Sequence, residues 1–522
     1  MIIIEQSLPT CKEYTTTDPI HLFLQFYLDK DKTHRREIRF ALKKNVKNPH
    51  IESIILLNER IYTDDELGIS SSKIKQVVID KRITYADFLQ YKIHGYKVLI
   101  NSDIFVDKTI QNIRTSDIHV HKKMFALLRY EYNDGDPQLF CRPNKTTGRE
   151  DSQDTWIVHS NHTFTKKQLD IIKIQLGVPG CDNKITYLFK MLGYEIYNDP
   201  SYIKTYHCHT TTTRNYTGFI EQPYCYVFPA NMPYSSPHPT VNDITMKIYS
   251  FSKSNTDLYH ALQSTSPILI PRIAGVENNF VISQDFTILQ NLMPTMKKNA
   301  GIHFNSIESI EQYKKWYLSA FDKCSIYTSW EPWGNVYKYI AFSHNEIQRL
   351  YPKPTIWAFV FDIFHYIHQP WTHALANKRI LIISSFVESI QKQPQAYPID
   401  LFPNCTFVYL KPPQTNGNNT SLDWQDEFKY FCKQIKKIEN EFDVALCSCG
   451  GYGNPICSYI YSLNKSAIYV GGVLQMYFGI YGNRWLTERK ESMKLYMTTD
   501  WKRPSDNEKP LNHNTIESGC YW

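Results

Sequence analysis

KVLINSDIF, residues 97–105, decides the fold, because it is a continuous apolar run that ends in Asn101 and Asp103. An uninterrupted run of this kind predicts a strand buried on both faces, as in a parallel sheet covered by helices. The surrounding sequence predicts further strands at 53–62, 74–80 and 124–132 and a helix at 82–93. Strands alternating with helices indicate an α/β domain with a doubly wound sheet.

A second α/β pattern follows a break in the sequence. PANMPYSSPHPTVND, residues 229–243, is rich in Pro and Ser and has no periodicity, which is typical of a linker. Beyond it the sequence predicts a strand and loop (266–280), a helix (306–321), a strand (378–386) and a strand–turn–helix–strand unit (442–472). We therefore expect a first domain at 1–228, a linker at 229–243 and a second α/β domain with a mainly parallel sheet at 244–522.

Composition narrows the class of protein. The net charge of +7 is spread over 522 residues without a basic cluster, which argues against nucleic-acid binding. No run reaches the ~18 apolar residues of a membrane span. The first residues lack the features of a signal peptide, so we expect a cytoplasmic location. The 12 cysteines contain no CxxC pair and are expected to be reduced thiols. Self-association as a homo-oligomer stays open.

Polar residues follow several of the predicted strands. Ligands of α/β sheets lie beyond the carboxyl ends of the strands, where Asn58, Asp80, Asp103 and Asp107 fall. We expect Asn58 and Asp80 to contribute to nucleotide binding. Each aspartate could instead be a turn or cap residue.

A strand-end carboxylate with a later histidine suits Mn²⁺ or Mg²⁺. In the transfer of a sugar from a nucleotide donor, such a cation would stabilise the diphosphate that leaves. We expect Asp103 to bind the cation, with His207 or His209 of YHCHTTTTRNY as the distal ligand. Asp107 is the alternative carboxylate, on a loop further along. The two histidines could instead form a buried polar cluster or a zinc site.

GVPGCDNKITYLF, residues 177–189, places Asp182 at the start of an amphipathic helix. The free N–H groups and the helix dipole are expected to hold this carboxylate in place and keep it ionised. Asp182 is thus the candidate base that removes the proton of the acceptor hydroxyl, which a sugar transfer needs if it inverts the anomeric centre. Asp154 is the competing candidate and is expected to bind sugar hydroxyls, whereas Arg129 is expected to contact a phosphate or the donor sugar. Asp182 could also serve only as a helix cap.

These segments together resemble glycosyltransferases of the GT-A fold over residues 50–217. KVLINSDIFVDKTI is similar to the family's acidic element at a strand end, with Asn101 at its first position. GVPGCDNKITYLFKMLGYEIYNDP resembles its helix-start segment, with Cys181 where Glu is common, so Asp182 carries over as the base. The resemblance implies a donor linked to UDP, GDP or dTDP, a glycan acceptor and a divalent cation.

The C-terminal half contains CSCGGYGNP, residues 447–455, after a predicted strand. Its glycines could let backbone N–H groups approach a phosphate, and a tight strand-to-helix turn explains them equally well. With PRIAGVENN, SWEPWGN and YVGG, the region 260–486 resembles GT-D-type transferase domains. The residues placed in its site are Gly450, Gly451 and Gly453 from the turn and, by the resemblance, Arg272, Glu277, Asn278, Gly471 and Glu331.

The leading hypothesis is a two-domain, bifunctional glycosyltransferase of a polysaccharide pathway. A second hypothesis keeps one active transferase domain and makes the C-terminal domain a binding module for the acceptor glycan. A third makes the chain a non-catalytic carbohydrate-binding protein that uses its many aromatic residues, among them 37 tyrosines.

Overall fold

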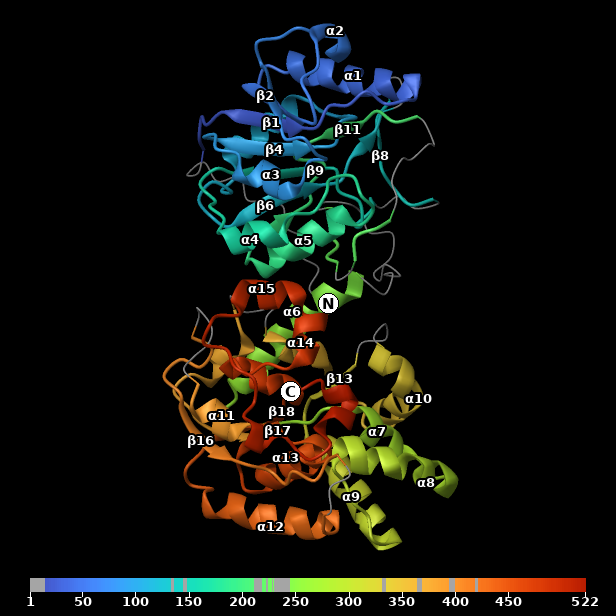
Figure 1. The fold of residues 1–522 in the computed structure, drawn as a ribbon, viewed down its shortest axis with the longest axis vertical. Coiled ribbons are helices and arrows are strands. Elements are labelled where there is room, and N and C mark those ends of the chain that lie inside the picture. Colours follow the sequence, from blue (N-terminus) through green and yellow to red (C-terminus); the bar gives the residue numbers. More distant parts are fainter. Residues whose placement is uncertain are drawn as a thin grey trace. The chain divides into compact units, whose positions relative to one another are not determined.

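The computed structural model describes residues 15–132, 136–143, 148–210, 218–221, 224–227, 229, 245–330, 335–363, 369–393, 400–417 and 421–522. The chain divides into two compact units between Ile248 and Tyr249 (Figure 1). Except for Pro229, the expected linker at 229–243 lies outside the described residues. No helix in the described parts of the chain has the length and apolar character needed to span a membrane.

A seven-stranded sheet is the centre of the N-terminal unit. Its strands are β1 (Ile20–Leu24), β2 (Ser53–Asn58), β3 (Ile74–Val78), β4 (Tyr96–Ile100), β6 (Lys123–Leu127), β9 (Thr155–His159) and β10 (Glu195–Tyr197), in the order β10-β6-β9-β4-β1-β2-β3. Only β9 runs antiparallel to its neighbours in this sheet. The predicted α/β class with a mainly parallel sheet is confirmed.

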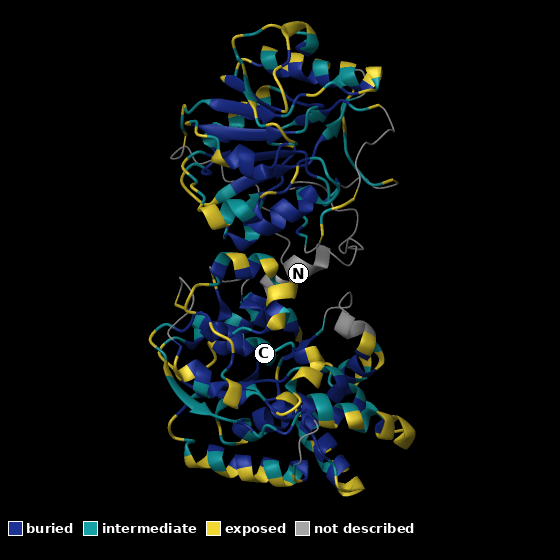
Figure 2. Ribbon diagram, viewed as in Figure 1, coloured by how far each residue is buried: buried dark blue, intermediate teal, exposed yellow. Residues whose placement is uncertain are grey.

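Helices flank this sheet and close its core. They are α1 (Lys32–Lys47), α2 (Asp64–Leu67), α3 (Tyr85–Gln90), α4 (Lys166–Ile171) and α5 (Cys181–Met191). Every residue of β1, β2 and β4 is buried, while many exposed residues lie on loops and on the outer faces of helices such as α1 (Figure 2). Burial on both faces explains why these strands are continuous apolar runs in the sequence.

A second, four-stranded sheet in the same unit corrects two predicted strands. Its order is β5-β11-β7-β8, from β5 (Ile104–Val106), β11 (Thr205–His207), β7 (Tyr130–Glu131) and β8 (Gln138–Leu139). The run at 97–105 is therefore not one strand but β4 and β5, and the run at 124–132 is β6 and β7. In both places the chain leaves the large sheet and joins the small one. Hydrophobicity persists through the bend, so the pattern alone does not reveal it.

The C-terminal unit contains a five-stranded sheet in which every neighbouring pair is parallel. Its order is β12-β18-β17-β15-β16, from β12 (Leu269–Ile270), β15 (Arg379–Ser384), β16 (Thr406–Leu410), β17 (Val444–Ser448) and β18 (Ser466–Tyr469); β13 (Tyr327–Ser329) pairs with β14 (Thr355–Trp357). The helices are α6 (Thr245–Leu262), α7 (Gly275–Ile282), α8 (Phe286–Thr295), α9 (Ile307–Lys323), α10 (Asn335–Leu350), α11 (Val387–Gln391), α12 (Trp424–Lys437), α13 (Gly453–Ser462), α14 (Asn483–Glu488) and α15 (Lys490–Tyr496). The strand–turn–helix–strand unit at 442–472 is confirmed, but the predicted loop after β12 forms α7.

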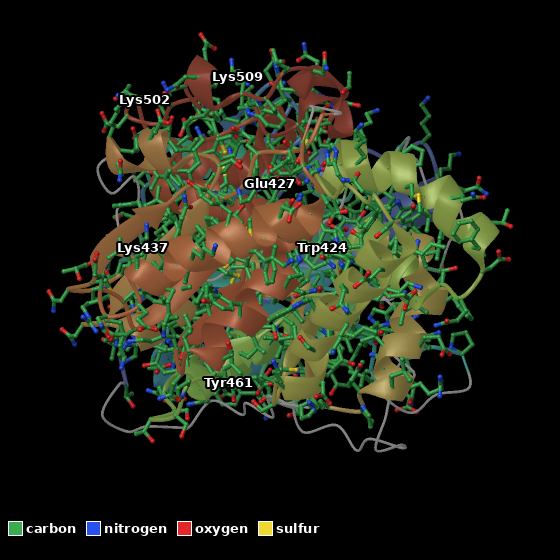
Figure 3. The ribbon with its side chains drawn as sticks, turned by 90° about the horizontal axis from the view of Figure 1, so that it is seen from below. Trp424, Glu427, Lys437, Tyr461, Lys502 and Lys509 are labelled. Atoms are coloured by element: carbon green, nitrogen blue, oxygen red, sulfur yellow. The ribbon has the colours of Figure 1, made fainter. Side chains whose placement is uncertain are left out.

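Amphipathic α12 shows how a covering helix is anchored in this unit. Asp423 caps the helix by accepting a hydrogen bond from the Gln425 N–H at 2.9 Å. The Trp424 indole is buried and donates to the Ser309 carbonyl of α9 at 2.8 Å. Figure 3 labels Trp424 and Lys437, the first and last residues of the helix. Lysine in the last turn complements the helix dipole.

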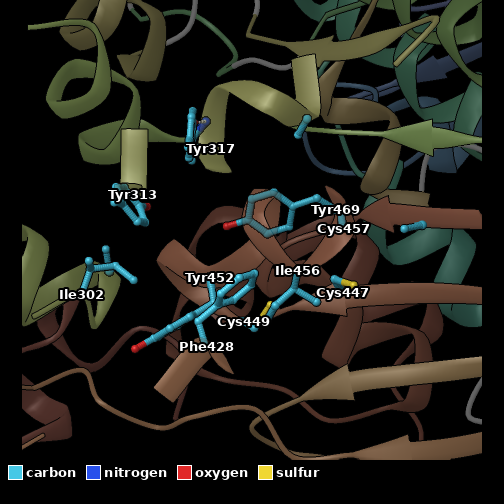
Figure 4. Close-up of a cluster of buried hydrophobic side chains, with 14 of the residues drawn as sticks. Ile302, Tyr313, Tyr317, Phe428, Cys447, Cys449, Tyr452, Ile456, Cys457 and Tyr469 are labelled. Atoms are coloured by element: carbon cyan, nitrogen blue, oxygen red, sulfur yellow. Dashed lines mark hydrogen bonds between the residues drawn. The ribbon is translucent and has the colours of Figure 1, made fainter. Parts of the chain in front are cut away.

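The glycine-rich turn after β17 packs directly against the apolar core shown in Figure 4. A Cβ atom added at Gly453 would lie 2.3 Å from the Tyr469 ring, and one at Gly451 would lie 2.5 Å from Ile302 Cγ1. The carbonyls of Gly450 and Gly451 accept hydrogen bonds from tyrosine hydroxyls, each at 2.8 Å. Close packing is therefore sufficient to require small residues here.

We expect Gly453→Ala to destabilise the C-terminal unit by about 1–3 kcal/mol, because the added methyl group overpacks the core against Tyr469. Gly275→Ala is the matched control, since a Cβ there meets nothing within 4 Å. Chemical denaturation of both variants measures the difference. Equal stability of the two variants would contradict the packing explanation.

Candidate active site

Asp103 lies in the turn that follows β4. The order of the large sheet reverses between β1 and β4, since β2 and β3 continue on the far side of β1. Such a switch point opens a crevice at the carboxyl ends of the strands, where α/β proteins bind ligands. The chain turns back into β5 directly after Asp103. Topology thus places a largely buried carboxylate at the expected ligand position.

Three histidine nitrogens surround one carboxylate oxygen, Oδ2 of Asp103. They lie 3.2 Å (His207 Nε2), 3.4 Å (His34 Nε2) and 3.5 Å (His209 Nδ1) from it. Burial opposes ionisation of Asp103, but the charge of His207 and the hydrogen bonds of the three rings hold its pKa well below the usual value. Burial likewise opposes the charge on His34 and His207, yet their carboxylate partners raise the pKa of each to about 9.

Two further carboxylates orient the imidazole rings. Asp29 Oδ2 lies 2.9 Å from His34 Nδ1, and Glu131 Oε2 lies 2.8 Å from His207 Nδ1. Each contact leaves Nε2 directed at Asp103. A carboxylate on the far ring nitrogen is the usual support of a metal-binding histidine.

The residues present fit a divalent cation, which would displace the proton on His207 Nε2 when it binds. Asp103, His207 and His209 offer ligand atoms within 4.8 Å of one another. One carboxylate with two imidazoles fits a first-row transition cation better than Mg²⁺, which prefers oxygen ligands. Of the two expected cations, Mn²⁺ is the better match to this set.

A network of charged side chains continues from the histidine cluster through Glu131. Its Oε1 accepts a hydrogen bond from Arg129 Nε at 2.7 Å, and Arg129 Nη1 donates to Asp154 Oδ2. Asn101 Nδ2 donates to Asp154 Oδ1 at 2.7 Å. The Arg129 side chain is only 8% exposed. Arg129 and Asp154 thus hold this network together. The predicted contact of Arg129 with a phosphate or the donor sugar, and that of Asp154 with sugar hydroxyls, stay predictions.

Replacing Arg129 by Met is expected to destabilise the N-terminal unit by about 3–5 kcal/mol, because the buried Asp154 and the half-buried Glu131 lose their cation. Arg60→Met is the control, since Arg60 pairs with Glu66 at an exposed site and its loss should change stability little. Denaturant unfolding of both variants measures the difference. If the two variants unfold alike, the buried network does not stabilise the unit.

Asp182 is the second residue of α5 and is half-buried. Its Oδ1 accepts from the Asn183 N–H at 2.9 Å and its Oδ2 from the Gln153 N–H at 3.3 Å. Contrary to the prediction that the helix keeps it ionised, burial and the nearby charge of Asp154 raise the pKa of Asp182 to about 7. A pKa near neutrality suits a general base. Burial raises the pKa of the preceding Cys181 thiol to about 12, so the thiol stays protonated at neutral pH.

The other predicted residues of this unit lie in different settings. Asn58 is buried, accepts from the Phe26 N–H at 2.9 Å and donates to Gln76 Oε1 at 3.2 Å, so its amide links the end of β2 to the segment after β1 and to β3. Asp80 is exposed after β3, in the left-handed region at φ 53°. Asp107, the alternative ligand, caps the next helical turn by accepting from the Thr109 N–H at 2.8 Å.

In the C-terminal unit, the Arg272 guanidinium lies over the Trp330 ring at 4.7 Å and donates to the Val470 carbonyl at 2.7 Å. Gly471 lies in the left-handed region at φ 79°, which favours glycine, and a Cβ there would also lie 2.0 Å from Arg272 Nη1. Glu277 is buried in α7; burial and the charge of Glu517 raise its pKa to about 7, against the opposing effect of Arg272.

The remaining predicted residues of that unit lie elsewhere in it or cannot be placed. Asn278 donates to Ser343 Oγ at 2.8 Å within the core. Glu331 lies outside the described residues.

Three site residues were not predicted from the sequence: Asp29, His34 and Glu131. The first two lie in DKDKTHRRE, which follows β1 and starts α1. A histidine in the first helical turn after the central strand is the signal that could have identified His34. Glu131 has no comparable local signal, because the small sheet brings it to His207 by pairing β7 with β11.

No protein-family model matches the chain, and no similar sequence was found among curated proteins. Solved structures that resemble it include GalNAc-T7 with UDP, GalNAc and Mn²⁺, at 10% identity and a TM-score of 0.27 over 36% of this chain and 44% of that chain. A DUF1792 structure matches at 11% identity and a TM-score of 0.27 over 50% and 94%. TarS 1–349 of S. aureus in complex with UDP-GlcNAc matches at 10% identity and a TM-score of 0.22 over 67% and 86%. The match spans less than half of GalNAc-T7. TM-scores this low support no conclusion about function, so the proposed function rests on the residues of the site.

Proposed function

We propose that the N-terminal unit is a cation-dependent, inverting glycosyltransferase that moves a sugar from a nucleotide-sugar donor to a glycan acceptor. The observation that carries this proposal is one connected set of polar contacts at the sheet's switch point. It runs from Asp103 through His207, Glu131 and Arg129 to Asp154. The charge of Asp154 in turn acts on Asp182. A cation-binding carboxylate and a base of near-neutral pKa are the two groups that such a transfer needs.

Asp103 and His207, with His209, would hold Mn²⁺, and the bound cation would offset the negative charge of the donor's diphosphate as it leaves. Asp182 would accept the proton of the acceptor hydroxyl. The acceptor oxygen forms the new bond to the anomeric carbon as the bond to the diphosphate breaks, so the configuration inverts. Arg129 would hold Asp154 and Glu131 in place, and so keep the cation-binding residues and the base Asp182 in fixed positions relative to each other.

A second transferase site in the C-terminal unit is the further candidate function. Glu277, a buried acid with a pKa near neutrality, lies within the electrostatic reach of Arg272. Such a pair in an α/β unit is a candidate site, although buried pairs also occur for structural reasons. The alternative is a unit that binds the acceptor glycan without chemistry.

A thermal-shift screen of the full chain against UDP-, GDP- and dTDP-sugars, with and without Mn²⁺, tests both proposals. Ligand at a hundredfold excess over Kd stabilises by about 2.7 kcal/mol. We expect a Mn²⁺-dependent shift that Asp103→Ala abolishes. A donor shift that survives Asp103→Ala but is lost in Glu277→Gln would support the C-terminal site. No shift with any donor would contradict the transferase proposal.

A further inference from the structure

A second group of metal-binding side chains lies beside the Asp103 cluster. His34, Glu37 and His209 offer ligand atoms within 4.8 Å of one another, and this group shares only His209 with the group around Asp103. His34 and Glu37 are three residues apart in α1, so they lie on one side of the helix. We propose that these three side chains hold a second divalent cation of the zinc class, next to the cation at Asp103 and His207.

Glu37 is positioned as a ligand by Thr210. Its Oε1 accepts from the Thr210 N–H at 2.8 Å and from the Thr210 hydroxyl at 2.6 Å. Its Oε2 is buried and has no hydrogen-bond partner among the described residues. A buried carboxylate oxygen without a partner is costly, and a cation would satisfy it. One oxygen is therefore anchored and the other is left for coordination.

His34 is oriented for coordination by Asp29. The contact of 2.9 Å between His34 Nδ1 and Asp29 Oδ2 fixes the ring. Its Nε2 lies 3.4 Å from Asp103 Oδ2, and a cation would replace the proton in that contact. Two imidazoles and a glutamate are the donor set of several catalytic zinc sites, which keep one further position open. Imidazole ligands also favour zinc over Mg²⁺.

The two groups differ in what they offer a cation. In the transferase proposal the cation at the Asp103 group would contact phosphate oxygens, whereas the Glu37 group joins α1 to the segment after β11. His34 lies 3.4 Å from Asp103 Oδ2 but takes no part in the proposed transfer, and neither does Glu37. With both cations bound, His209 would serve the second site, and Asp103 and His207 would keep the first cation. Zinc bound to the second site would stabilise the N-terminal unit by mass action.

Zinc stoichiometry of the full chain tests this inference. After removal of metals by a chelator, native mass spectrometry and calorimetric titration with Zn²⁺ count the ions and give their affinities. We expect two ions for the wild type and one for Glu37→Gln, with the lost ion bound at least about 100-fold more weakly. His34→Gln should lose the same ion, and Asp103→Asn should keep it. Glu52→Gln, which removes an exposed carboxylate of the same unit, should keep both.

Two results would overturn the second site. One is a Glu37→Gln variant that binds as many zinc ions as the wild type, with the same affinities. The other is an Asp103→Asn variant that binds none, since that would show one site rather than two. Absence of donor turnover would leave this zinc count unchanged, so failure of the transferase proposal is recognisable separately.

Discussion

Asp103→Ala is expected to lower Mn²⁺-dependent donor turnover by about 1000-fold, because the cation loses the carboxylate at the centre of its site. The three histidine nitrogens that point at Asp103 Oδ2 would then face one another without the charge that holds them. Release of nucleoside diphosphate, measured over a range of Mn²⁺ concentrations, gives the effect. Excess Mn²⁺ should recover little of the rate.

Glu52→Gln is the control for a lost carboxylate in the same unit, and its turnover should equal that of the wild type. Asp107→Ala tests the alternative ligand; Asp107 caps a helical turn, so we expect a small loss of stability with turnover largely kept. Wild-type turnover in Asp103→Ala would remove Asp103 from the cation site.

Asp182→Asn is expected to reduce the transfer rate by about 10²- to 10⁴-fold, the range for loss of a general base, with donor affinity unchanged. The wild-type rate should rise with pH until Asp182 is ionised, near its pKa of about 7. This rise should be absent from the residual activity of the variant. Initial rates with donor and acceptor between pH 5 and pH 9 measure both effects. A variant that keeps full turnover would assign the base to another residue.

The same substitution is expected to stabilise the chain at alkaline pH. The pKa of Asp182 is raised from 3.8 to about 7, so the folded chain binds this proton more tightly than the unfolded chain, and stability falls as the pH rises between these values. The full difference corresponds to about 4 kcal/mol. We expect a gain of about 1–3 kcal/mol at pH 8, because Asn offers one acceptor to two backbone N–H groups. The gain should vanish near pH 5, and thermal unfolding at both pH values measures it.

The sequence predicted the parts of the site that are carried by local motifs. Asp103 after a buried strand and the histidines of YHCHTTTTRNY are found together in the structure. What the sequence could not predict depends on contacts between distant segments. Glu131 reaches His207 only because β7 pairs with β11, and the pKa of Asp182 is set by burial and Asp154 rather than by its own helix.

In the fold, too, local features could be predicted from the sequence, whereas those set by distant contacts could not. Apolar runs predicted the buried strands, yet they did not reveal where the chain passes from the large sheet to the small one. The glycine-rich turn was predicted as a turn or a phosphate site. Its tight packing follows from Ile302, which lies against Gly451, and from Tyr469, which lies against Gly453; both residues are distant from the turn in the sequence.

Calorimetric titration of the Asp182→Asn variant with the donor selected by the screen tests the central claim most directly, since this variant should bind the donor without consuming it. We predict binding with Mn²⁺ that matches the wild type within about threefold, no measurable binding without the cation, and none in the Asp103→Ala/Asp182→Asn double variant. Equal donor binding with and without Mn²⁺, or donor binding retained in the double variant, would contradict the assignment of Asp103 and its histidines as the cation site of a glycosyltransferase.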